Sequence, residues 1–242
     1  MPLNVNGNII ESTDVSASGN VLKNKVISDG LICYLDAADA DSYSGSGTQW
    51  TDLSGNGYHG TLVNGATFNS GVAGGVMVTD GTNDYISIST PSLVSTNYTI
   101  IGGAKYATVD AGANSYDSGR IFSANLNNWL MGWWNGYTEN YYAVGWISAV
   151  SSGASDTNWR IEATTGDITK DLYTLYVNGT PTVTNNNGGS EGPNGFSLGR
   201  YAIGGTEYAN AYISFFLVYN RILERHEISQ IYQSFKGRLG LS

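Results

Sequence analysis

Turn dipeptides recur along the middle of the chain, and they constrain the fold more than any other feature. Between residues 30 and 220 they are Asn64-Gly65, Asp80-Gly81, Asn135-Gly136, Gly166-Asp167, Asn178-Gly179 and Gly204-Gly205. Gly and Asn accept positive φ angles, so such pairs favour tight turns. Segments between them, such as Tyr85-Ile86-Ser87-Ile88-Ser89, alternate apolar and polar residues with the period of a half-buried strand. This pattern predicts a β-sandwich rather than alternating β–α units.

The size and charge of the chain exclude several other classes of protein. A length of 242 residues suits one large all-β domain. The formal net charge is −9 with only 11 Lys and Arg residues, which do not form the basic clusters that a phosphate backbone requires. No apolar run approaches the ~20 residues of a membrane helix. We therefore expect neither nucleic-acid binding nor membrane insertion.

The segment Trp50-Thr51-Asp52-Leu53-Ser54-Gly55-Asn56-Gly57-Tyr58-His59-Gly60 combines an anchoring ring, a carboxylate and a tight turn. It resembles a motif of the laminin-G-like, concanavalin A-like jelly-roll domains. The resemblance continues in Gly30–Ala37, in Asp80–Ile88, in Leu175–Thr180 and in Phe196–Arg200. It implies an antiparallel jelly-roll β-sandwich of the concanavalin A-like lectin/glucanase type.

The end of the chain carries the most specific part of the resemblance. Val218–Leu223, a short helix and Phe235–Leu241 resemble the close of such domains in virion structural proteins of tailed phages, of the marine or cyanophage type. Ile228, Ile231, Tyr232 and Phe235 have helical spacing and predict that short C-terminal helix. The resemblance covers about residues 29 to 242 and implies a phage virion protein.

Residues 1–28 differ from the rest of the chain. They are rich in Asn and Ser, contain no aromatic residue and cannot form a core of their own. We interpret 1–28 as an N-terminal arm and 29–242 as the jelly-roll domain. The arm is either a partly ordered leader or an attachment segment that docks onto another virion protein or exchanges between subunits.

Aromatic residues concentrate between positions 129 and 159, and this region is the candidate binding surface. Adjacent side chains of a regular strand point to opposite faces. One member of each of the pairs Trp133-Trp134 and Tyr141-Tyr142 should therefore face outward. Aromatic rings match the C–H faces of sugars. The candidates for glycan or subunit contact are Trp129, Trp133, Trp134, Tyr137, Tyr141, Tyr142 and Trp146; packing in a large sandwich core is the alternative.

Catalytic and metal-binding signals are weak. Only seven Glu occur, and no two have the strand spacing of the paired carboxylates of glycoside hydrolases. We therefore predict no enzymatic activity. Relatives of this fold often hold calcium through oxygen ligands, which hard cations prefer. The calcium candidates are Asp52, Asn56, Asp80, Asn83 and Asp84, with hydrogen bonding in turns as the alternative role.

Two functional hypotheses follow. The first is a non-enzymatic phage structural or decoration protein on the virion surface, which displays a jelly roll on capsid or tail, is anchored by residues 1–28 to other virion proteins and can form a homo-oligomer. The second is a carbohydrate-binding adhesion module that recognises a host-surface glycan. Both can hold, because multivalent display strengthens weak sugar binding.

Overall fold

The computed structural model describes residues 3–5, 8–10, 26–109, 118–151 and 153–242. Near the N-terminus, β1 (Leu3–Val5) and β2 (Asn8–Ile10) form an antiparallel pair. The predicted attachment arm, 1–28, lies largely outside the described residues and stays a prediction. Val26 and Ile27 are described, and both pack against the domain.

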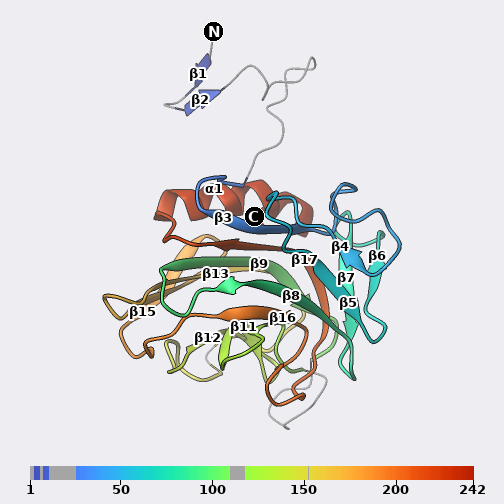
Figure 1. Ribbon diagram of the computed structural model, residues 1–242. Helices are drawn as coiled ribbons and strands as arrows, with labels where there is room; N and C mark the ends of the chain where they lie inside the picture. The colour runs from blue at the N-terminus through green and yellow to red at the C-terminus, as the bar shows by residue number, and fades with distance from the viewer. Residues whose placement is uncertain (1–2, 6–7, 11–25, 110–117, 152) are drawn as a thin grey trace.

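Two antiparallel sheets form the body of the domain (Figure 1). One has seven strands, in the order β12-β11-β10-β16-β8-β5-β4. Their bounds are Tyr137–Ala143, Trp129–Trp134, Phe122–Ala124, Asn194–Leu198, Tyr85–Ser92, Gly60–Val63 and Gln49–Trp50. The chain passes from this sheet to the other one and back several times. The neighbouring strands β8, β16 and β10 are therefore far apart in sequence.

The other sheet has eight strands, with β15-β14-β13-β9-β17-β7-β6 in order and β3 paired to β17. Their bounds are Thr180–Asn185, Leu172–Val177, Arg160–Asp167, Tyr98–Tyr106, Asn210–Tyr219, Val76–Asp80, Thr67–Asn69 and, for β3, Leu31–Asp36. The long strand β17 pairs with β9 along one side. On its other side it pairs first with β7 and then with β3. The predicted antiparallel β-sandwich is confirmed.

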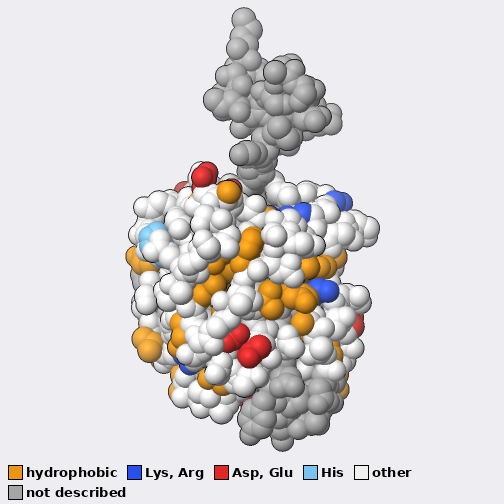
Figure 2. Space-filling model, turned by 90° about the vertical axis from the view of Figure 1, so that its right-hand side faces the viewer, with side chains coloured by type: hydrophobic (Ala, Val, Ile, Leu, Met, Phe, Trp, Pro, Cys, Tyr) orange, Lys and Arg blue, Asp and Glu red, His pale blue; other side chains and the backbone are white. Residues whose placement is uncertain are grey.

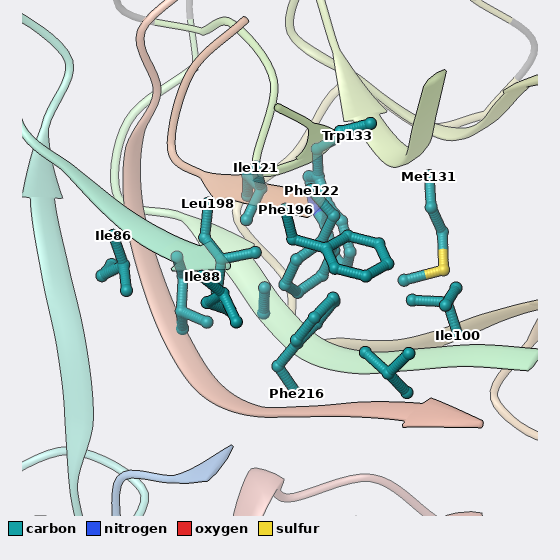
Figure 3. Close-up of a cluster of buried hydrophobic side chains, with 14 of the residues drawn as sticks. Ile86, Ile88, Ile100, Ile121, Phe122, Met131, Trp133, Phe196, Leu198 and Phe216 are labelled. Atoms are coloured by element: carbon teal, nitrogen blue, oxygen red, sulfur yellow. The ribbon is translucent and has the colours of Figure 1, made fainter. Parts of the chain in front are cut away.

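The main core lies between the two sheets. Figure 3 shows side chains from both sheets meeting there, with Phe122 and Phe196 from one sheet against Phe216 from the other. The pair Gly102-Gly103 in β9 has a packing reason, because a Cβ at Gly102 would overlap the Phe122 ring and one at Gly103 the Phe215 ring. Glycine thus allows aromatic rings to approach β9 on both of its faces.

The helix α1 (Arg225–Phe235) covers the outer face of the eight-stranded sheet (Figure 1). Ile228, Ile231, Tyr232 and Phe235 are its buried residues, so the predicted helical stripe is confirmed. They form a second core with Phe215, Leu217 and Tyr219 of β17. A 3₁₀ helix, η2 (Lys236–Leu239), follows. Within the described residues, no helix is long and apolar enough to cross a bilayer.

Strands β4 to β7 lie at one end of the sandwich, and Figure 2 shows the molecule from that side. Hydrophobic side chains gather in the middle of this view, with acidic side chains below them. Partly buried residues that pack against the core from these strands and their loops include Tyr58, Ala66 and Phe68. This end of the sandwich therefore presents a group of hydrophobic side chains on its surface.

Candidate functional site

The adjacent aromatic pairs of β11 and β12 point to opposite faces of the seven-stranded sheet. Trp133 and Tyr141 are fully buried, whereas Trp134 and Tyr142 are partly exposed. The expectation that one member of each pair faces outward is confirmed. A register shift between Gly132 and Trp134 marks a bulge in β11 just before the exposed tryptophan, where bulges commonly redirect a side chain.

Three of the proposed contact residues belong to the core instead. Trp129, Trp133 and Tyr141 each have 0% relative exposure. Trp129 packs edge-on against Phe196 and Tyr141, and its Nε1–H donates to the Tyr98 hydroxyl. The prediction that these three residues contact a glycan directly was wrong, because the inward-facing side chains of a sandwich form its core.

The outward-facing rings form a cluster that we term the aromatic platform: Trp134, Tyr142 and Trp146. The Trp146 ring lies 5.2 Å from the Trp134 ring and 5.2 Å from the Tyr142 ring, measured between centroids. All three side chains are partly exposed. Tyr137, another candidate, is partly exposed opposite Trp134 in the ladder. Four of the seven aromatic candidates are thus partly exposed, and three of them form the platform.

Polar groups fix one edge of the aromatic platform. Trp134 Nε1–H donates to Glu207 Oε2 at 3.0 Å, and Arg120 Nε donates to the same oxygen at 2.6 Å. Arg120 also donates to Asn128 Oδ1 at 2.7 Å. Its guanidinium carbon lies 3.9 Å from the centre of the Tyr201 ring. This is the first Arg–Tyr stack, and its buried arginine is neutralised by Glu207.

A second Arg–Tyr stack lies one residue away along the chain. The guanidinium carbon of Arg200 is 3.4 Å from the centre of the Tyr85 ring. Arg200 Nε donates to Ser197 Oγ at 3.2 Å, and the Arg200 carbonyl accepts a hydrogen bond from Ser123 Oγ. The stack therefore joins β8, β16 and β10 through side chains on one surface.

That surface is the outer face of the seven-stranded sheet. Ile86, Phe122 and Leu198 point into the core, as Figure 3 shows. Their neighbours Tyr85, Ser123 and Ser197 must therefore point outward, because successive side chains alternate. On this side of the sheet, Glu207 and Arg120 link the aromatic platform to Tyr201, which is next to Arg200 in the chain.

Glu162 on β13 connects the two sheets near the platform's strands. Its Oε1 accepts the backbone N–H of Glu139 on β12 at 3.1 Å, and its Oε2 has no hydrogen-bond partner among the described residues. Burial, reinforced by the charge of Glu139, raises the pKa of Glu162 to about 8, against the smaller opposing effects of that hydrogen bond and Arg160. Glu139 has a φ of 63°, so the backbone is locally strained where it meets this carboxyl group.

Sequence reasoning missed five residues of this face: Tyr85, Arg120, Arg200, Tyr201 and Glu207. They come from segments separated by up to 122 positions, which only the strand order brings together. Phe196–Arg200 was recognised as a strand, and its terminal arginine is unusual in a chain with so few cations. The small number of cations was therefore the one sequence signal that could have pointed to Arg200.

The calcium candidates Asp52 and Asn56 have a structural role. Asp52 accepts backbone N–H groups of Tyr34, Ser54 and Tyr58. Burial by itself raises the pKa of Asp52, but these donors and the Ser54 hydroxyl outweigh it and hold the pKa below its usual value. Asn56 Nδ2 donates to the carbonyls of Leu31 and Ile32, so these hydrogen bonds fasten the loop to β3.

Asp80, Asn83 and Asp84 lie in the turn between β7 and β8. Asp80 Oδ1 accepts the N–H groups of Thr82 and Asn83, as in an Asx turn. Burial and the charge of Asp80 raise the pKa of Asp84 to about 6. Among the described residues no three His, Cys, Asp or Glu side chains are grouped to hold a metal. Calcium also accepts amide and backbone carbonyl oxygens, so calcium binding by the candidate residues stays a prediction.

The fold and this face define a lectin-type jelly roll. A family model described as the concanavalin A-like lectin/glucanases superfamily matches residues 80–229, and the chain belongs to that superfamily. No match was found among curated proteins.

Several solved structures have a similar fold at low sequence identity. The binding domain of Paraclostridial Mosquitocidal Protein 1 has a TM-score of 0.61 at 16% identity, over 88% of this chain and 56% of that one. Domain 4 of AbnA, an extracellular arabinanase of Geobacillus stearothermophilus in complex with arabinotriose, scores 0.59 at 17% identity, over 84% and 98%. The receptor-binding domain of botulinum neurotoxin C/D mosaic serotype scores 0.59 at 14% identity, over 86% and 52%. The chain thus spans little more than half of the two toxin domains.

Proposed function

We propose that the protein is a non-catalytic carbohydrate-binding domain whose ligand lies on the outer face of the seven-stranded sheet. The aromatic platform is the observation that carries this proposal. Its three rings are partly exposed, and Glu207 fixes the orientation of Trp134 through the indole N–H. Exposed rings with fixed polar neighbours suit sugars, because the rings contact C–H groups while polar groups bind hydroxyls.

The similar structures support a binding role. Two of them are binding domains of toxins, and the arabinanase domain was solved with arabinotriose. Their sequence identity to this chain is low, so they support a binding role for this fold but do not indicate a particular sugar.

The carboxylates around the face favour binding over hydrolysis. Glu207 forms an ion pair with Arg120 and accepts a hydrogen bond from Trp134. Its Oε2 is thus occupied by two donors of the protein itself, whereas glycoside hydrolysis requires one carboxyl group as proton donor and another as base or nucleophile at the cleaved bond. Glu162 has a raised pKa, but it is fully buried between the sheets. The proposal therefore includes no enzymatic activity.

The test is calorimetric titration of the full chain with arabino-, xylo-, gluco- and galacto-oligosaccharides. Trp146→Ala removes the central ring of the platform, and Trp159→Ala is the matched control. Trp159 is also partly exposed, but it packs on the helix-covered side of the molecule. Trp146→Ala should weaken binding ~10- to 100-fold, as for a central aromatic contact. Equal effects of both variants would contradict the proposed location, and no binding of any sugar would contradict the function.

The virion location is a second proposal. It is favoured by the resemblance of Val218–Leu223 and Phe235–Leu241 to phage virion proteins. In this proposal the jelly roll is displayed on the particle surface, residues 1–28 attach it to other virion proteins, and copies of the chain assemble with one another. Binding to a host glycan would then gain from multivalency.

Imaging of phage particles stripped of this protein tests that location. The full chain is compared with a chain that lacks residues 1–24 and retains Val26 and Ile27, which pack on the domain. Decoration by the full chain alone supports the arm as the anchor. Decoration by both places the attachment on the sandwich, and decoration by neither contradicts the virion role.

A further inference from the structure

Arg200 differs from the other arginines of the molecule. Arg120, Arg160, Arg221 and Arg238 each pair with a carboxylate, respectively Glu207, Asp156, Glu227 and Asp36. Within the described part of the chain, Arg200 and Arg225 have no such partner. Arg225 is exposed at the start of α1, where water solvates it. Arg200 is only partly exposed, and it stands on the candidate binding face with its charge unpaired.

The Arg200 side chain is held in one orientation. Tyr85 stacks under the guanidinium plane, and Nε donates to Ser197 Oγ at 3.2 Å. Ser123 binds the backbone carbonyl of the same residue, so both backbone and side chain are fixed. The two terminal nitrogens, Nη1 and Nη2, make no hydrogen bond to the described residues. A guanidinium fixed in this way has its remaining donors prepared for a ligand, because little side-chain freedom is left to lose on binding.

The geometry of these donors favours a planar monoanion. A guanidinium edge matches the two oxygens of a carboxylate through parallel N–H···O bonds. Phosphate groups are usually held by several cations or backbone N–H groups. Arg120, the arginine of the first Arg–Tyr stack, is already occupied by Glu207. One arginine without a carboxylate partner among the described residues, on the same sheet as the aromatic platform, therefore fits a sugar ring that bears one carboxylate.

The net charge of −9 opposes an acidic ligand only weakly. Charges on a protein surface are screened over about 8 Å at physiological ionic strength. The interaction is thus decided by the groups nearest to the ligand carboxylate, which here are the Arg200 guanidinium and the Tyr85 ring.

We propose that this face selects carboxylated saccharides, uronates or sialates, by bidentate binding of their carboxylate to Arg200. The inference rests on the proposed carbohydrate-binding function and specifies the class of sugar. Arg200 is the residue that determines specificity, and the aromatic platform contacts the sugar irrespective of its charge.

Two pairs of probes separate charge from sugar. Trigalacturonic acid is compared with its methyl ester, and 3′-sialyllactose with lactose, by calorimetric titration of the full chain. The wild type should prefer at least one acid over its neutral partner by about 10- to 100-fold, the range of charge-assisted hydrogen bonds. The pair that shows the preference identifies the source of the carboxylate. The preference should weaken as salt is added.

Arg200→Gln should abolish the preference, because it removes the pair of charged donors that binds the carboxylate. Arg225→Gln is the matched control, because it removes the same charge from the helix-covered side of the molecule, and it should retain the preference. Arg200→Lys should restore only part of it, because lysine lacks the planar pair of donors. Thermal unfolding of each variant checks that the fold is intact.

The outcomes separate the two proposals. Equal binding of acid and neutral partner overturns the role of Arg200 but leaves the carbohydrate function standing. An acid preference that survives in Arg200→Gln also overturns it. Displacement of trigalacturonic acid by a tetraglutamate peptide at equal carboxylate concentration overturns selectivity for a saccharide. If none of the four sugars and none of the neutral oligosaccharides binds, both proposals fail.

Discussion

The outer face of the eight-stranded sheet is covered by α1, whereas the outer face of the seven-stranded sheet presents the aromatic platform and the two Arg–Tyr stacks. On the covered side, Phe215, Leu217 and Tyr219 of β17 are fully buried under the helix. On the open side, Tyr85 and Arg200 are partly exposed. Both sheets contribute to the same central core. The second core under α1 therefore stabilises the eight-stranded sheet, whereas the residues described on the outer side of the other sheet include partly exposed aromatic and cationic side chains.

The two sheets also differ in the patterns of their strands. Ile213-Ser214-Phe215-Phe216-Leu217-Val218-Tyr219 in β17 is apolar at nearly every position, because both of its faces are buried. The strand β8 alternates in Tyr85-Ile86-Ser87-Ile88-Ser89, because only one face is buried. In these two strands the pattern of apolar residues thus reflects whether both faces or only one face is buried.

The largest expected effect on the difference between the two faces comes from removing the Phe235 ring, which anchors α1 to the sheet. The Phe235 ring of α1 stacks on Phe215 with centroids 3.8 Å apart. Phe235→Ala should lower the free energy of unfolding by about 3 to 5 kcal/mol, as for other buried Phe-to-Ala changes. Denaturant titration measures this loss. Sugar binding well below the unfolding midpoint should be unchanged.

Tyr142→Ala on the open face is the control for that substitution. Tyr142 is partly exposed and contacts Trp146, so its loss should change stability by less than about 1 kcal/mol while it weakens sugar binding. If Tyr142→Ala were as destabilising as Phe235→Ala, the division between a structural and a binding face would be wrong.

Glu162→Gln tests the interior of the molecule, where Glu162 of the eight-stranded sheet contacts Glu139 of the seven-stranded sheet. The pKa of Glu162 is raised from an ordinary 4.5 to about 8, so the folded protein retains a proton that the unfolded chain has released. Stability contributed by this protonated carboxyl is full below pH 4.5 and falls as pH rises towards 8, by roughly 1.4 kcal/mol per pH unit. The neutral Gln removes that loss and should stabilise the protein by about 3 kcal/mol at pH 7.

Denaturant titrations of Glu162→Gln and wild type between pH 5 and 8 check the sign. The stabilisation should be small at pH 5 and grow with pH. Parallel curves would show that Glu162 does not titrate with a raised pKa. A variant that is less stable at every pH would show that the buried oxygens require a carboxyl group and not an amide.

The fold could be predicted from local patterns, but only part of the site could. Alternation and turns are local signals, and they identified the sandwich and the outward turn of one residue in each aromatic pair. They could not tell which member faces outward, so Trp133 and Tyr141 were assigned to the surface although they are buried. That choice depends on which face of the strand meets the other sheet.

The two Arg–Tyr stacks were beyond sequence reasoning for another reason. Tyr85 and Arg200 meet because β8 and β16 are neighbours in the sheet, and Arg120 reaches Tyr201 because β10 lies beside β16. Strand order follows from how the whole chain packs, and no local period encodes it. The turn chemistry of Asp52, by contrast, is local, and its role as an acceptor of backbone N–H groups was foreseen and confirmed.

The smallest effect tests how α1 begins on the covered face, and it has the opposite pH dependence. Glu227 pairs with Arg221 at 2.6 and 2.8 Å and accepts the N–H of Glu224 at 2.8 Å. The Arg221 pair lowers the pKa of Glu227, so its stabilisation is present above the ordinary pKa and lost as pH falls through the lowered one. Glu227→Gln should lower stability by about 1 kcal/mol at pH 7 and by less in acid. A loss that grew in acid would contradict this sign, and with it the assignment of Glu162 and Glu227 to opposite electrostatic roles in one domain.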